Sequence, residues 1–148
     1  MKADTAGPSL MARRLGVGGL IPFMSLAAAL WLGWPHDWVP ANIALLGYGA
    51  TICSFLGAIH WGLVMREGSA QAVPSLLWGV LPSLLGWVAL LLGQAVGLLL
   101  IAVLLWACFL VDRVLYPRYQ LQAWLPMRLR LTLVASGSCL AGAAALLH

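Results

Sequence analysis

The stretch AVGLLLIAVLLWACFLV, residues 95–111, decides the fold class, because no charged side chain interrupts it. About 20 predominantly apolar residues in a helix span the hydrocarbon core of a bilayer. The run is continuously apolar rather than alternating, which favours a helix over a strand of a membrane β-barrel. The sequence therefore predicts a transmembrane helix here.

Four further apolar runs accompany this span, and the composition agrees with them. Of the 148 residues, 63% are hydrophobic and 8% are charged, whereas soluble domains carry about 25% charged residues. The four acidic residues are too few to solvate a globular surface. We expect an all-α, polytopic membrane helical bundle of five transmembrane helices. Their expected ranges are 15–34, 41–65, 74–92, 95–111 and 131–147.

The positions of the basic residues predict the topology. Lysine and arginine occur at the N-terminus and in the second and fourth connections, and the first and third connections have neither. Cytoplasmic loops carry an excess of these residues. We therefore expect a cytoplasmic basic tail at residues 1–14, an interfacial cytoplasmic segment at 112–130 and a C-terminus outside. The basic residues are Lys2, Arg13, Arg14, Arg66, Arg113, Arg118, Arg128 and Arg130.

The N-terminal region also indicates a membrane. Its apolar run is too long for the apolar region of a secretory signal and has no clear small-residue cleavage site, so we expect it to be retained. Few serines and arginines argue against an organelle transit peptide. We expect a bacterial inner membrane, or a mitochondrial inner membrane if the source is eukaryotic. Because the basic residues are dispersed at span boundaries, they indicate lipid contact and argue against nucleic-acid binding.

Small residues recur on one face of several expected spans. Gly49, Cys53, Gly57 and His60 fall on one arc of the helix 41–65. Small residues let helix backbones approach closely in a bilayer. We interpret these arcs as packing seams of a compact bundle, and a pocket or a homo-oligomer seam is the alternative. The positions expected to pack helices are Gly49, Gly57, Gly79, Ser83 and Gly86.

His60 is the one ionisable residue well inside an expected span, beneath the inner interface. An ionisable group inside a membrane marks a candidate functional site, and histidine suits a proton relay or a pH sensor. The alternative is a structural imidazole bonded to Asp112, a backbone carbonyl or a loop. Asp112 ends the fourth span on the same side and is the acidic partner that we expect. It could equally pair with Arg14, Arg66 or Arg128.

The chain offers little other chemistry. Cys53, Cys108 and Cys139 lie in apolar runs without a CxxC pattern, so we expect them to pack as small apolar residues. There is no P-loop, no Gly-rich dinucleotide turn and no GxSxG motif. The sequence therefore predicts no metal and no cofactor, and it favours a binding or packing protein over an enzyme.

The run YGATICSFLGAIHWG, residues 48–62, resembles the signature YxAxIxSFLGxxHWG of the transmembrane protein 69 family. A second segment, WLPMRLRLTL at residues 124–133, is similar to the family's W-(Y)-x-x-L-R-x-x-L-T, with the second aromatic replaced and the arginine spacing slightly shifted. The resemblance implies a five-helix membrane protein, bacterial or mitochondrial, without an established reaction. It directs attention to Ser54, Gly57, His60, Trp61, Asp112 and Arg130.

Two classes of function follow from these patterns. The first is a non-enzymatic inner-membrane protein that packs against, assembles or stabilises a membrane complex, with another membrane protein or a second copy as partner. The second is a lipid- or quinone-binding or proton-relay protein that uses His60 and Asp112 near the cytoplasmic interface. A lipid-modifying enzyme is disfavoured because paired carboxylates, nucleophiles and metal ligands are scarce. The candidate polar cluster comprises His60, Asp112, Ser54, Trp61 and Arg130.

Overall fold

The computed structural model describes residues 7–33, 39–68 and 73–148, and within these ranges it contains helices and no strand. Five segments are long and apolar enough to cross a membrane, with α1 and α2 together forming the first. The predicted all-α bundle of five spanning helices is confirmed. The elements are α1 (Leu10–Gly18), α2 (Ile21–Trp31), α3 (Ala41–Glu67), α4 (Val73–Leu92), α5 (Gln94–Leu115), the 3₁₀ turns η1 (Tyr116–Tyr119) and η2 (Gln122–Trp124), and α6 (Leu125–Leu147).

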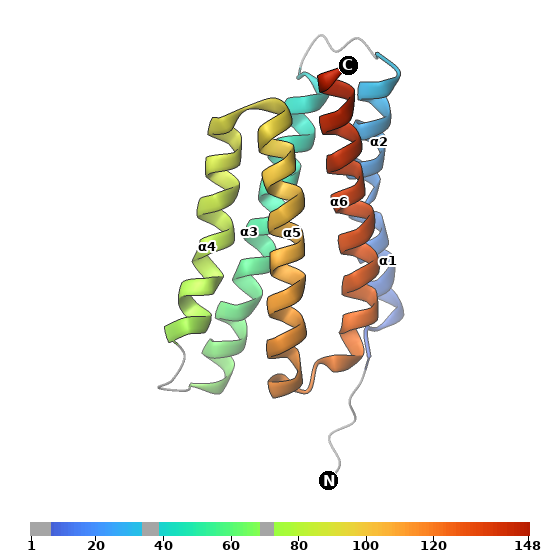
Figure 1. Cartoon of the computed structure of the whole chain (residues 1–148). Helices are drawn as coiled ribbons and strands as arrows, with labels where there is room; N and C mark the ends of the chain where they lie inside the picture. The colour runs from blue at the N-terminus through green and yellow to red at the C-terminus, as the bar shows by residue number, and fades with distance from the viewer. Residues whose placement is uncertain (1–6, 34–38, 69–72) are drawn as a thin grey trace.

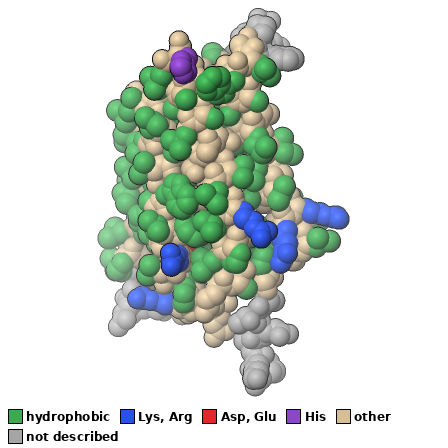
Figure 2. All heavy atoms as spheres, turned by 45° about the vertical axis from the view of Figure 1, so that its right-hand side comes forward, with side chains coloured by type: hydrophobic (Ala, Val, Ile, Leu, Met, Phe, Trp, Pro, Cys, Tyr) green, Lys and Arg blue, Asp and Glu red, His purple; other side chains and the backbone are tan. Residues whose placement is uncertain are grey.

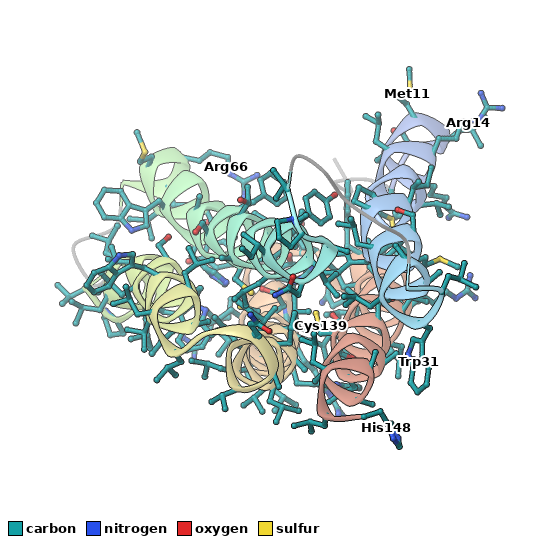
Figure 3. All side chains as sticks on the ribbon, turned by 90° about the horizontal axis from the view of Figure 1, so that it is seen from above. Met11, Arg14, Trp31, Arg66, Cys139 and His148 are labelled. Atoms are coloured by element: carbon teal, nitrogen blue, oxygen red, sulfur yellow. The ribbon has the colours of Figure 1, made fainter. Side chains whose placement is uncertain are left out.

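The helices stand side by side, with the start of α1 and the end of α6 at opposite ends of the bundle (Figure 1). α3 is the central helix, because it contacts α2, α4, α5 and α6. Seen from above, α4 and α2 flank α3 on either side, and α5 and α6 cover its remaining inner face (Figure 3). The main contacts of α4 are with α3 and α5.

The surface is that of a protein surrounded by lipid. Large apolar side chains are exposed along every span, among them Leu15, Phe55, Trp87 and Val103. On the face shown in Figure 2, apolar side chains cover most of the height, and the basic side chains lie toward the end at which α1 begins. A soluble domain rarely exposes so continuous an apolar surface.

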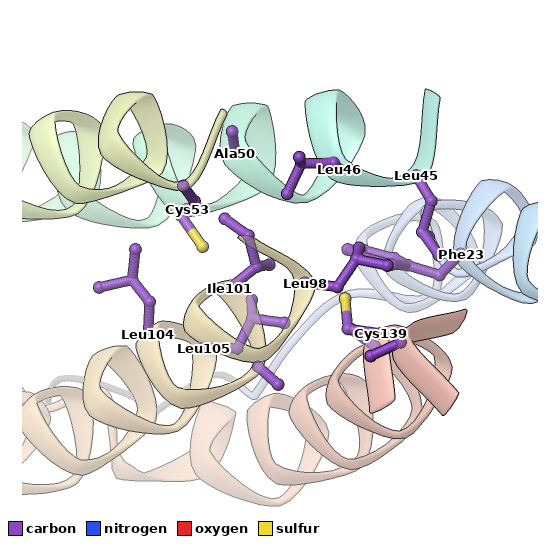
Figure 4. Close-up of a cluster of buried hydrophobic side chains, with 14 of the residues drawn as sticks. Phe23, Leu45, Leu46, Ala50, Cys53, Leu98, Ile101, Leu104, Leu105 and Cys139 are labelled. Atoms are coloured by element: carbon purple, nitrogen blue, oxygen red, sulfur yellow. The ribbon is translucent and has the colours of Figure 1, made fainter. Parts of the chain in front are cut away.

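The hydrophobic core lies between α2, α3, α5 and α6. Phe23 of α2, Leu45 of α3 and Leu98 of α5 are fully buried and meet there (Figure 4). Lipid tails are as apolar as these side chains, so the stabilisation comes from close van der Waals packing rather than from exclusion of water. The three cysteines are free and buried, which agrees with the expected packing role.

Glycines bring α3 and α4 into backbone contact. A Cβ atom at Gly57 would collide with the carbonyl oxygen of Gly79, and one at Gly86 would lie 3.3 Å from the Cα of Ala50. The indole Nε1 of Trp61 donates to the carbonyl oxygen of Leu76 on the same side, at 2.9 Å. These small residues therefore set how closely the two helices approach.

The other two expected packing positions differ from each other. Gly49 faces α5, where a Cβ would lie 2.7 Å from Cγ2 of Ile101. Ser83 is half-buried on α4, and no side-chain hydrogen bond joins it to another described residue. Gly49 thus extends the glycine contacts of α3 to a second neighbour.

The first span is broken between α1 and α2. Pro22 lies at the start of α2 and has no N–H, which ends the hydrogen-bond ladder of the preceding turn. The carbonyl oxygen of Gly19 at the break accepts a hydrogen bond from the hydroxyl of Tyr48, at 2.8 Å. The ring of Tyr48 packs edge-on against Phe23 with centroids 5.0 Å apart. The break is therefore pinned to α3 and lies just before Pro22.

The first span, formed by α1 and α2, covers parts of two predicted segments, the tail 1–14 and the span 15–34. It begins at Leu10 inside the predicted tail, and it ends at Trp31. Residue 34 and residues 1–6 lie outside the described residues. α1 begins where it does because the hydroxyl of Ser9 accepts a hydrogen bond from the N–H of Ala12, at 3.2 Å, and so caps the helix.

The predicted interfacial segment 112–130 is shorter in the structure than expected. α5 continues to Leu115 and α6 begins at Leu125, so only η1 and η2 connect them. Asp112 and Arg128 lie in these helical extensions and are buried. The sequence prediction assigns these residues to a connection because they are charged. In the structure the two charges pair with each other, so both side chains can be buried inside the bundle.

The glycine contact predicts unequal effects for two substitutions on α3. Gly57→Ala should lower the stability by about 1–3 kcal/mol, because the new methyl group collides with the backbone of α4. Gly62→Ala is the matched control, since nothing lies within 4 Å of a Cβ there. Thermal unfolding in one detergent compares the two variants, and equal midpoints would contradict the close α3–α4 contact.

Candidate functional site

Asp112 holds two buried side chains from two other helices. Its Oδ2 accepts hydrogen bonds from Nε and Nη2 of Arg128, at 2.8 and 2.6 Å. Its Oδ1 lies 3.1 Å from Nε2 of His60. The exposed fractions are 1% for His60, 1% for Asp112 and 8% for Arg128. We call these three residues the ion triad.

The three helices bring the ion triad to one depth. His60 lies about two turns before the end of α3, Asp112 less than one turn before the end of α5, and Arg128 in the first turn of α6. Because α6 runs antiparallel to α5 across a short connection, its first turn lies beside the last turn of α5 (Figure 1). Pro126 is the second residue of α6, where it has no N–H that would need a partner.

The charges of the ion triad compensate each other. An unpaired carboxylate inside a bilayer is costly, and a guanidinium that donates two hydrogen bonds is its strongest side-chain partner. Because Arg128 already balances the charge of Asp112, the carboxylate needs no further positive charge, and Nε2 of His60 lies within hydrogen-bonding distance of its Oδ1. The Nδ1 of His60 is buried and has no partner among the described residues. A proton relay through His60 would therefore lack a next proton donor or acceptor at Nδ1 among those residues.

Two further polar side chains lie beside the ion triad. Tyr116 is 4% exposed, and its hydroxyl lies close enough to Asp112 and Arg128 to interact with both charges. Thr132 follows Arg128 by one turn on the same face of α6, is 2% exposed, and has no hydrogen-bond partner for its Oγ1. The ion triad is thus part of a larger buried polar region.

The structure brings together two of the five residues of the predicted cluster. His60 and Asp112 form the expected contact. Ser54 is half-buried and donates to the carbonyl oxygen of Ala50 in its own helix, at 3.0 Å. Trp61 is exposed and bonds to α4 as described above, and Arg130 is exposed. The last three lie apart from the ion triad.

The predicted cluster omitted Thr132 and Arg128, although Arg128 was one of the alternative partners expected for Asp112, and the structure shows that pairing. Residues four apart share a face of a helix, whereas residues two apart point in nearly opposite directions. Arg128 therefore faces inward with Thr132, and Arg130 faces outward. The spacing Arg-x-x-x-Thr within an apolar run was the available signal.

A cavity of about 340 Å³ adjoins this polar region. Arg128 and Thr132 stand in its wall, and the remaining lining is almost entirely apolar. Ligand cavities in proteins are typically of this kind, apolar with a few polar groups. The other lining residues are Ala12, Leu15, Gly16, Gly19, Leu20, Phe23, Ile52, Phe55, Leu56, Ile59, Leu105, Trp124, Met127, Leu131 and Ala135.

The broken first span accounts for the cavity. α2 buries Phe23 and Ala27 against its neighbours, whereas α1 buries no residue. Met11 and Arg14 on α1 point away from the bundle (Figure 3). The cavity lies in the space between α1, α3 and α6 that this divergence leaves. Leu15 and Phe55 line it and are themselves largely exposed, so it opens sideways toward the lipid.

Comparison with known proteins adds a family but no chemistry. The family model described as "Protein of unknown function (DUF3429)" matches residues 8–145. A protein named "Transmembrane protein 69" from Xenopus tropicalis is 40% identical over 92 residues, which cover 60% of this chain and 34% of that protein. The match thus spans about a third of that relative's length. No solved structure matches the chain.

The ion triad predicts non-additive effects of substitution. Arg128→Met should lower the stability by about 3–5 kcal/mol, because it leaves the carboxylate of Asp112 buried and uncompensated. Adding Asp112→Asn should restore most of this loss, since the amide oxygen still accepts from His60 and neither charge remains. Thermal unfolding of the single and double variants measures the coupling.

Arg130→Met is the control for this series, because Arg130 is exposed. Its effect should stay within about 0.5 kcal/mol. If the double variant were no more stable than Arg128→Met, the buried charge pair would not be what holds these helices together.

Proposed function

The chain belongs to the DUF3429 family of proteins of unknown function, and on this premise we propose that it is an intramembrane binding protein for an amphipathic lipid or quinone. The proposal rests on one observation, the lateral apolar cavity with Arg128 and Thr132 in its wall. The hydrophobic tail of the ligand occupies the cavity, and its polar group lies against these two residues.

The position of the cavity supports this function. Thr132 lies about 10 Å along α6 from Leu125, at the rise of a regular helix. The ligand's polar group would therefore lie inside the bundle, about two turns of α6 from its basic end, and its tail would lie among apolar side chains. An amphipathic lipid already resident in the bilayer can enter sideways between α1 and α3 without crossing water.

The ion triad supports binding more than proton transfer. Its members are joined by fixed hydrogen bonds, and Nδ1 of His60 has no described partner to continue a relay. His60 acts through Asp112, which orients the guanidinium of Arg128 at the cavity wall. The triad is a positioning device, and the residues that meet the ligand are on α6.

A second candidate function is that of a packing or assembly partner of another membrane protein. The outward face of α3 favours it, because the small residues Gly47, Thr51, Ala58 and Gly62 lie there beside the exposed ring of Phe55. Nothing lies within 4 Å of a Cβ at Gly47 or at Gly62. Such a surface suits the close approach of a further helix, either from another protein or from a second copy.

The distribution of basic residues supports a proposed location and orientation. The protein is a multi-pass membrane protein, and the proposed membrane is the inner membrane of a bacterium, or of a mitochondrion if the source is eukaryotic. The proposed orientation has the basic end of the bundle in the cytoplasm and the C-terminus outside, as the excess of arginine at one end favours.

Purification in a gentle detergent tests the two functions together. Mass spectrometry of the native-level protein should find a lipid or quinone in fixed ratio, and a stoichiometric membrane protein instead would support the second function. Ala12→Phe places a ring at the cavity wall and should reduce ligand retention roughly tenfold, because about 1.4 kcal/mol of lost contact is tenfold in affinity. Equal retention by Ala12→Phe and the wild type would refute the cavity as the site.

Ala28→Phe is the matched control for this substitution. Ala28 lies on α2, is exposed and does not line the cavity. It should retain ligand as the wild type does. A loss of ligand in both variants would point to a general effect of added bulk on the first span.

The orientation is tested with reporter fusions in bacterial cells. A periplasm-dependent phosphatase fused after His148 should be active, and the same enzyme inserted after Gln120, in the connection between α5 and α6, should be inactive. The reverse pattern would overturn the proposed orientation.

A further inference from the structure

The hydroxyl of Thr132 is the one feature of the cavity wall that the protein's own contacts do not explain. Thr132 is 2% exposed, it lines the cavity, and its Oγ1 has no hydrogen-bond partner among the described residues. A buried hydroxyl without a partner costs free energy, and such groups are rare in folded proteins. The side chain therefore points to a partner that the chain itself does not contain.

Three other hydroxyls in the spans differ from Thr132. In helices, serine and threonine satisfy themselves by donating to a carbonyl oxygen of the preceding turn. Thr51, Ser54 and Ser138 do so at 2.9–3.0 Å. Ser138 lies on the same helix as Thr132, so the geometry of α6 permits this bond. Thr132 lines the cavity, and its hydroxyl does not form this bond.

Arg128 supplies a second donor at the same place. Its hydrogen bonds to Asp112 use Nε and Nη2 and leave Nη1 outside that pair. Arg128 and Thr132 lie one turn apart on α6 and both line the cavity. The wall therefore offers donors close together in an otherwise apolar space.

The charge balance limits what these donors can bind. The positive charge of Arg128 is already matched by Asp112. An anionic group inside the cavity would be an uncompensated charge in an apolar space, which is strongly unfavourable. A neutral oxygen that accepts hydrogen bonds avoids this cost.

From these contacts, and resting on the proposed lipid- or quinone-binding function, we infer that the cavity takes an uncharged carbonyl group at the head of a hydrophobic chain, with Thr132 as its hydrogen-bond donor. Arg128, held by Asp112, lies beside the same oxygen. Two sources carry this chemistry in a membrane: the ring carbonyl of a quinone and the ester carbonyl of a glycerolipid.

The test compares Thr132→Val with Thr132→Ser in the purified full-length chain. Valine keeps the shape and removes the hydroxyl, whereas serine keeps the hydroxyl. One arm titrates a short-chain ubiquinone analogue and follows tryptophan fluorescence, because Trp124 lines the cavity and quinones quench indole emission. The other arm measures retention of phosphatidylcholine or phosphatidylglycerol by native mass spectrometry.

The expected result is a Kd about tenfold higher for Thr132→Val, the size of one lost hydrogen bond, and a Kd within about twofold of wild type for Thr132→Ser. The thermal midpoint of Thr132→Val should not fall, because no hydrogen bond within the chain is lost. Dependence on the hydroxyl in the quinone arm identifies a quinone, and dependence in the lipid arm identifies an ester carbonyl.

Two outcomes overturn the inference, and they differ in what else they overturn. If a probe binds the wild type and Thr132→Val equally well while Ala12→Phe weakens it, the cavity binds its ligand without Thr132 and the proposed function stands. If no probe binds the wild type, or if Ala12→Phe has no effect on any of them, the proposed function fails together with the inference.

Discussion

The carboxylate of Asp112 is buried inside a membrane bundle. The packing of the helices at this end of the bundle depends on how its charge is compensated. Hydrocarbon offers no water to solvate it, so its hydrogen bonds must come from the protein. Arg128 and His60 supply them from two other helices. Because these hydrogen bonds are short and directional, α3, α5 and α6 cannot slide past each other without uncovering a charge.

α4 is held by a different kind of contact. It contributes nothing to the ion triad, and its contact with α3 relies on backbone proximity at Gly57, Gly79 and Gly86 and on the hydrogen bond from Trp61. Many weak contacts of this kind require a matched surface over several turns. The bundle thus combines one directional polar junction, which joins α3, α5 and α6, with one extended close contact, which joins α3 and α4.

Hydropathy and residue depth predicted the five spans and the contact between His60 and Asp112, because both follow from properties of single helices. Arg128 was one of three arginines that the sequence offered as alternative partners of Asp112, and this reasoning could not single it out. Its charge assigned it to a cytoplasmic connection, and only the pairing with Asp112 shows why it can lie inside. Arg130, suggested by the family resemblance, is two residues away and faces outward. The cavity escaped prediction too, because its volume depends on the angle between α1 and α2.

That angle links the local sequence to the character of the site. Pro22 ends one helical ladder, Tyr48 holds the freed carbonyl of Gly19, and α1 diverges beside the polar region of α6. A cavity open to a bilayer does not stay empty, since lipid tails reach it at all times. Its apolar lining therefore cannot distinguish one tail from another. Any selectivity must come from the few polar groups in its wall, and these are placed by the ion triad that holds the bundle together.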